Sequence, residues 1–188
     1  MRYEQIVCAL IVSGCASSAT GRPFAAPMSA RLRLELSVKD QPALSLEEDR
    51  VRRVDMQYAD LPVELTLSNE SERELWVNAR LSVAWRPAFP GMAEVNLDVT
   101  GPEGAVAFTC MPRYAEADPS AYRILKPGER VTVRALIPCP GALNRPGLYT
   151  AQATYQDGNA HAPAAPPGTE RMIEAVASGP VQFRVISK

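Results

Sequence analysis

Residues 31–38 read RLRLELSV, and this stretch decides the fold class. Leucine or valine occupies every even position, and a charged or small polar residue occupies every odd position. A period of two places all the apolar side chains on one face of an extended strand. The pattern therefore predicts a β-strand with one face in a hydrophobic core and the other in water.

The same alternation recurs along most of the chain. Strands that are apolar on one face only are typical of antiparallel sheets. Between residues 74 and 85 the odd positions, from Leu75 to Trp85, are expected to form the apolar face of a single long strand. The further runs are PVELTLSN at 62–69, ELWVNARLSVAW at 74–85, EVNLDV at 94–99, RVTVRALI at 130–137, LYTAQATY at 148–155 and VQFRVIS at 181–187.

Turn signals separate these runs, and no stretch has a convincing helical period. GPEG at 101–104, KPGE at 126–129 and RPG at 145–147 combine the preset φ of proline with the tolerance of glycine for positive φ. The stretch SLEEDRVRRVDM at 45–56 fits either a helical turn or a charged loop entering a strand. Residues 30–188 are therefore expected to form an all-β, antiparallel sandwich of about seven to nine strands.

The order of LPVELTLSNESERELWVNARL, KPGERVTVRALI, RPGLYTAQATY and SGPVQFRV resembles the immunoglobulin-like sandwich of bacterial envelope proteins, over residues 61–186. The layout also resembles the domain of bacterial proteinase-inhibitor-like proteins and the sandwich attached to some secreted metallopeptidases. The resemblance implies a fold, because many functions share this sandwich. It implies a tyrosine corner at Tyr149, whose phenol would bond back to the backbone. Ala151 stands where the antibody pattern has a cysteine, so the usual disulfide between the sheets is not expected.

The first residues have the parts of an export signal. Arg2 precedes a short apolar run over residues 6–12, which is too short to span a bilayer. Val12-Ser13-Gly14-Cys15 follows and resembles the lipobox of bacterial lipoproteins. This resemblance implies a signal peptide over residues 1–14 and a diacylglycerol on Cys15. An ordinary signal peptide with an incidental cysteine is the alternative.

Residues 15–29 are expected to tether the domain to a membrane. They are small, contain Pro23 and Pro27 and show no periodicity, which is typical of a flexible linker. Ala16, rather than aspartate, follows the cysteine. By the rule known for enteric bacteria this implies the outer membrane of the cell envelope, and it leaves the leaflet open.

Composition and motifs favour neither catalysis nor nucleic-acid binding. The formal net charge is -1, so there is no electrostatic footprint for nucleic acid. His161 is the only histidine and cannot supply a zinc site of two or three histidines. No hydrolase, phosphate-loop or EF-hand motif is present. We expect a non-enzymatic protein with no catalytic residues, no metal and no cofactor.

Two cysteines remain once Cys8 and Cys15 are assigned to the signal and the lipid. Cys110 and Cys139 form an even pair in an exported domain, and such pairs are usually oxidised. We predict a disulfide between them. Two buried free thiols are the alternative.

Trp76 is the leading candidate for contact with a partner. Its parity is opposite to that of Trp85, so its side chain is expected to point outward, beside Asn78 and Arg80. Tryptophan and arginine are enriched at binding hot spots. The alternative is that a loop or the N-terminal segment covers Trp76. The Ala- and Pro-rich insert at 157–177 is a second candidate surface.

These features predict a membrane-anchored binding or accessory module that engages another envelope protein by its loops or a sheet edge. One alternative is a proteinase inhibitor, in which a Cys110–Cys139 bridge stiffens a loop that inserts Arg113 into a protease. Another is a carbohydrate-binding module, which few aromatic residues support. The oligomeric state is left open by the sequence.

Overall fold

The computed structural model describes residues 31–49, 54–85, 93–106, 119–137, 143–159 and 161–187. These residues form fourteen strands and one 3-10 turn, η1 (Pro119–Ala121), without an α-helix. The strands are β1 (Leu32–Val38), β2 (Ser45–Asp49), β3 (Val54–Tyr58), β4 (Leu61–Asn69), β5 (Leu75–Asn78), β6 (Val83–Trp85), β7 (Val95–Gly101), β8 (Gly104–Ala105), β9 (Tyr122–Leu125), β10 (Arg130–Ile137), β11 (Gly147–Tyr155), β12 (Glu170–Arg171), β13 (Val176–Ala177) and β14 (Val181–Val185).

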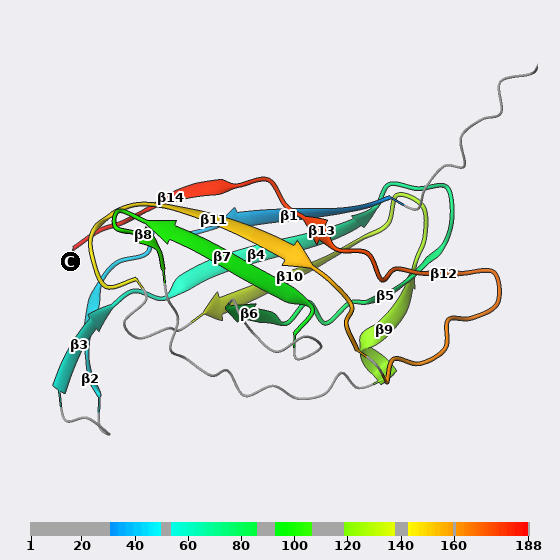
Figure 1. The fold of residues 1–188 in the computed structure, drawn as a ribbon, viewed down its shortest axis with the longest axis horizontal. Coiled ribbons are helices and arrows are strands. Elements are labelled where there is room, and N and C mark those ends of the chain that lie inside the picture. The colour runs from blue at the N-terminus through cyan, green and yellow to red at the C-terminus, as the bar shows by residue number, and fades with distance from the viewer. Residues whose placement is uncertain are drawn as a thin grey trace, which may run out of the picture.

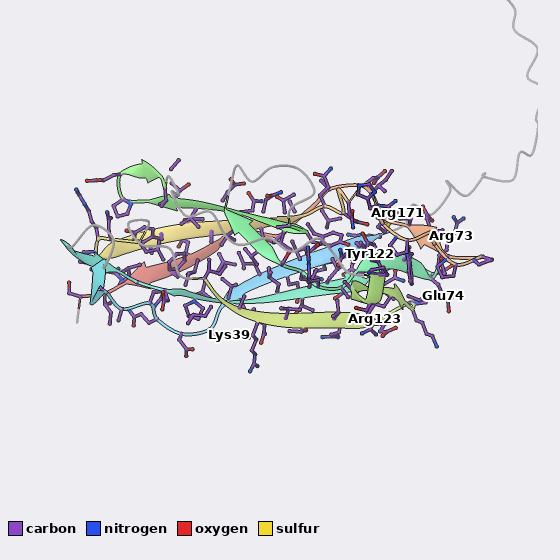
Figure 2. All side chains as sticks on the ribbon, turned by 90° about the horizontal axis from the view of Figure 1, so that it is seen from below. Lys39, Arg73, Glu74, Tyr122, Arg123 and Arg171 are labelled. Atoms are coloured by element: carbon purple, nitrogen blue, oxygen red, sulfur yellow. The ribbon has the colours of Figure 1, made fainter. Side chains whose placement is uncertain are left out.

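Two sheets form the layers of a sandwich. The first has the strand order β1-β4-β10, and the second has the order β13-β11-β7-β6, with β14 also paired to β11 and β8 to β7. The longer strands of the two sheets run nearly along the same axis (Figure 1), and a view turned by 90° separates the layers (Figure 2). The all-β sandwich predicted from the alternation is confirmed. An immunoglobulin-like topology stays a prediction.

The core lies between these layers and follows the predicted parity. In β1 and β4 every second side chain is buried, and Leu34 stands opposite Leu67 in the antiparallel register. In β11 the same parity buries Tyr149, Ala151 and Tyr155. Each buried leucine of this kind contributes about 1.5–3 kcal/mol relative to an exposed one. The alternating pattern therefore specifies both the strands and their register.

Two smaller sheets lie at the ends of the sandwich. At one end β5 pairs with β9 and with β12. At the other, β2 and β3 form an antiparallel hairpin. This hairpin occupies the ambiguous stretch at 45–56, so the described part of that stretch is strand rather than helix.

The single strand predicted over residues 74–85 is wrong. The chain instead forms β5 and β6, which belong to different sheets. Between them the Asn78 Oδ1 atom accepts a hydrogen bond from the Arg80 backbone N–H at 3.1 Å, and Leu81 has a φ of 48°. A strand ends where a side chain accepts the hydrogen bond of a backbone N–H, and also where a residue adopts a positive φ. Two short pairs, β5 with β12 and β6 with β7, are parallel.

The tyrosine corner is confirmed. Tyr149 is buried, and its hydroxyl donates to the Arg145 carbonyl at 2.9 Å. Its ring stacks on Phe183 with the centroids 5.6 Å apart. The backbone of Gly101 packs against the same ring, because a Cβ there would lie 2.6 Å from Cε1 of Tyr149. This corner joins β7, β11 and β14 at one end of the second sheet.

Candidate functional site

Trp76 lies on β5 under the long segment that connects β11 to β12. Its indole N–H donates to the Pro163 carbonyl at 3.3 Å, and its ring stacks on Tyr122 of β9 at 5.9 Å. The neighbouring Leu75 and Val77 are fully buried on the core face. Trp76 therefore points away from the core, as its parity predicts, and residues of the 157–177 insert cover part of it.

Asp157 fixes the start of this segment. It follows β11 and is 4% exposed. Its Oδ1 accepts hydrogen bonds from the Tyr122 hydroxyl at 2.9 Å and from the Asn159 backbone N–H at 3.3 Å, and its Oδ2 accepts one from Arg171 Nη2 at 3.2 Å. Burial, followed by the nearby Asp157 carboxylate, raises the pKa of Tyr122 above its usual value. A neutral phenol at this position is therefore a stable donor to Asp157.

Arg171 holds the far end of the segment against its start. The same guanidinium that meets Asp157 also donates to the Asn159 carbonyl at 3.0 Å. Beside it, Glu170 forms an ion pair with Arg73 at 3.4 Å. Figure 2 places Arg171, Arg73 and Tyr122 at the same end of the molecule, away from Lys39. The segment is thus closed at its base by the ion pair of buried Asp157 with half-buried Arg171 and by the pairing of β12 with β5.

A second buried carboxylate organises the turn between β5 and β6. Glu94 is 4% exposed and accepts hydrogen bonds from Asn78 Nδ2 at 3.0 Å, Arg80 Nη2 at 2.5 Å and Ser82 Oγ at 2.6 Å. The Tyr155 hydroxyl donates to the Asn78 carbonyl at 3.3 Å. Burial, followed by the charges of nearby carboxylates, raises the pKa of Tyr155 far above its usual value. This cluster fixes the turn that breaks the predicted long strand.

The outward position predicted for Asn78 is wrong. Asn78 is fully buried, because its side-chain amide bonds to Glu94 and to the backbone of the following turn. The side chain of Arg80 is 25% exposed and is paired with Glu94. Both residues therefore serve the turn, whereas Trp76 contacts the insert through its bond to Pro163.

Several predicted residues fall outside the described residues. These are Cys15, the Cys110–Cys139 pair and Arg113, so the lipid, the disulfide and the inhibitory loop stay predictions. Trp85 lies on β6 opposite Leu97, and only its backbone is described. His161 is exposed, and its backbone N–H donates to Asn159 Oδ1 at 2.9 Å.

Among the described residues, no group of three or more His, Cys, Asp or Glu side chains is arranged to hold a metal ion. No described helix is long and apolar enough to cross a membrane.

The residues that sequence reasoning missed are Tyr122, Asp157, Arg171 and Glu94. A signal for Asp157 was present: the odd positions of β11 point inward, and Asp157 continues that parity two residues after buried Tyr155. A carboxylate at an inward position needs a buried donor or cation. Nothing in the local sequence identifies Arg171 as that cation, because a loop separates the two residues. No protein-family model and no curated protein matches the chain.

Proposed function

We propose that this protein is a lipid-anchored, non-catalytic binding module of the bacterial envelope, which engages a protein partner through the 157–177 segment. The observation that carries the proposal is how this segment is held. It has little regular structure, yet it is tied down at its base by Asp157 and Arg171 and in its middle by the bond from Trp76 to Pro163. A segment that is already ordered loses little conformational entropy when a partner binds.

The segment also presents apolar surface to solvent. Ile173 lies two residues after the end of β12 and is 63% exposed, which is the largest exposure among the large hydrophobic residues described. Buried Met172 lies beside it and fixes its position in the chain. An exposed apolar side chain on a fixed backbone is a suitable anchor for a protein interface.

The anchor is proposed from the Val12-Ser13-Gly14-Cys15 motif. Acyl chains on Cys15 would bind a bilayer with about 0.8 kcal/mol for each buried CH₂ group. Residues 16–29 would then hold the sandwich close to the membrane, and its partner would be another envelope protein. The expected test is incorporation of labelled palmitate into the full chain. The Cys15→Ala variant should neither incorporate the label nor fractionate with membranes. A Cys15→Ala chain that still does either would contradict the proposed anchor.

The binding surface is tested by photo-crosslinking in the bacterial host. A photoreactive residue is placed at Ile173 or His161 in the segment, and the matched control is Leu148, which is 51% exposed near the start of β11. The proposal expects one specific cross-linked product from the two segment positions and none from Leu148. Equal cross-linking at Leu148, or no product at either segment position, would contradict it.

A further inference from the structure

The free edge of β1 has the geometry to extend the first sheet into another chain. Among the strands that the structure describes, β1 pairs with β4 only, so it forms one edge of the order β1-β4-β10. The Glu70 N–H donates to the Arg31 carbonyl, and the Lys39 N–H donates to the Pro62 carbonyl. The odd residues of β1 therefore direct their backbone N–H and C=O groups towards β4. In an antiparallel pair the intervening residues then direct their N–H and C=O groups the other way. Leu32, Leu34 and Leu36 therefore present their backbone groups to the edge.

Within the described ranges these edge groups have no backbone partner. A groove of about 450 Å³ runs along this edge. Residues 33–37 of β1 form one wall and Gly179, Pro180 and Val181 form the other. β1 contains no proline and no inward-pointing charge, two of the features that protect an edge in other sheets. The edge is regular, and the groove separates it from Gly179, Pro180 and Val181.

The charges of β1 favour a second copy of the same strand. When two β1 strands pair antiparallel about Leu34, Leu34 faces its own copy, and Arg33 of each chain stands opposite Glu35 of the other. Both side chains are more than half exposed, at 58% for Arg33 and 51% for Glu35. Within one chain Arg33 forms ion pairs with Glu35 at 2.9 Å and with Glu70 at 3.2 Å, and the dimer would exchange the first of these for pairs between the chains. Opposite charges directly across an antiparallel pair stabilise it. This register also keeps Leu32, Leu34 and Leu36 in the hydrogen-bonding positions.

Neighbouring registers bring like charges together. A shift that centres the pair on Arg33 places Arg33 opposite itself, although it also sets Arg31 opposite Glu35. A shift that centres the pair on Glu35 places Glu35 opposite itself and Arg31 opposite Lys39. The other edge of the same sheet behaves differently, because the only charged residues of β10 are Arg130 and Arg134. Two β10 strands would therefore bring like charges together without a compensating pair. Of these two edges, only β1 is complementary to itself.

We infer that the protein forms a symmetric homodimer in which two β1 strands pair antiparallel about Leu34, with reciprocal Arg33–Glu35 ion pairs across the interface. The interface lies along β1, and the opposite wall of its groove, residues 179–181, closely follows the 157–177 segment in the chain.

The test uses native mass spectrometry of the full chain and two charge-reversal variants. Arg33→Glu makes both facing positions acidic, and Glu35→Arg makes both basic. Each variant alone is expected to dimerise about tenfold more weakly than the wild type. An equimolar mixture is expected to form heterodimers at wild-type strength, because each acidic edge then meets a basic edge. Arg134→Glu on β10 is the matched control and should leave dimerisation unchanged.

Hydrogen exchange provides a second measurement that does not depend on the variants. In the wild type the amides of Leu34 and Leu36 should become protected as the protein concentration rises, because oligomers form by mass action. A wild-type chain that remains monomeric at about 100 μM overturns the inference. So does a mixture of the two variants that fails to recover the dimer, since recovery depends on the proposed register.

Discussion

At the scale of single residues, the close approach of Gly101 to Tyr149 gives a sharp test of packing. The ring cannot retreat easily, because Phe183 stacks on it and its hydroxyl is held by the Arg145 carbonyl. We predict that Gly101→Ala lowers the free energy of unfolding by about 1–3 kcal/mol through overcrowding. Chemical denaturation measures the change. Gly179→Ala is the control, since nothing lies within 4 Å of its added Cβ, and an equal loss in both variants would contradict this packing.

Tyr155 makes stability depend on alkaline pH. Its pKa in the folded protein is raised, mainly by burial, so the folded state holds the phenolic proton more tightly than the unfolded state. The resulting stabilisation is complete below the ordinary tyrosine pKa of about 10 and is lost as the pH rises towards the folded-state value. We predict that denaturation curves between about pH 9 and 11 show a smaller loss of stability per pH unit in Tyr155→Phe than in the wild type. Identical slopes would refute the assignment.

The candidate site shows what residue-scale reasoning can reach. The alternation of inward and outward positions correctly predicted that Trp76 points away from the core. The same rule wrongly predicted that Asn78 points outward, whereas Asn78 is buried. Asn78 departs from the rule because β5 ends there and its amide bonds to Glu94. The pairing of Asp157 with Arg171 depends on the path of a loop, which has no periodic signal in the sequence.

At the scale of elements, the turn between β5 and β6 depends on one carboxylate. Glu94 receives bonds from Arg80 and from the backbone and side chain of Ser82. Glu94→Gln removes the charge of a buried carboxylate that accepts bonds from Arg80 and Ser82, so we predict a loss of about 2–4 kcal/mol in the free energy of unfolding. Hydrogen exchange should show faster exchange in residues 83–85.

The matched control for Glu94 is Glu64, which also meets two cations. Lys39 and Arg134 lower the pKa of Glu64 by their hydrogen bonds, but all three groups lie on the solvated face of the first sheet. Exposed ion pairs contribute little to stability. Glu64→Gln should therefore unfold almost as the wild type does, and a cost as large as that of Glu94→Gln would show that burial is not the cause.

The elements themselves were largely predictable. RLRLELSV and RVTVRALI form β1 and β10, because one buried face fixes both the strand and its register. The long strand at 74–85 was mispredicted because its apolar parity continues across a turn that is fixed by distant Glu94. The pair β5–β12 was also not predictable, since it joins chain segments that are far apart in sequence. The pair β6–β7 was not predictable because alternation does not show that two neighbouring strands run parallel.

At the scale of the whole molecule, the sandwich serves as a rigid base for one unusual segment. The second sheet delivers Asp157 at the end of β11, and the small β12-β5-β9 sheet supplies Trp76, Tyr122 and Arg171. Binding by a segment placed on a rigid base is common in sandwich folds, because the sheets tolerate variation in their connections. The central claim is that this base orders the 157–177 segment for a partner.

The most direct measurement is the yield of photo-crosslinking from Ile173 in the wild type and in Asp157→Asn. This substitution removes the charge that holds Arg171, while most of the sandwich core is unchanged. The control is Glu103→Gln, which removes an exposed ion pair with Arg145 at the β7–β8 turn. We predict that the yield falls in Asp157→Asn and is unchanged in Glu103→Gln, with both chains folded by circular dichroism. An undiminished yield in Asp157→Asn would contradict the claim that the ordered segment binds the partner.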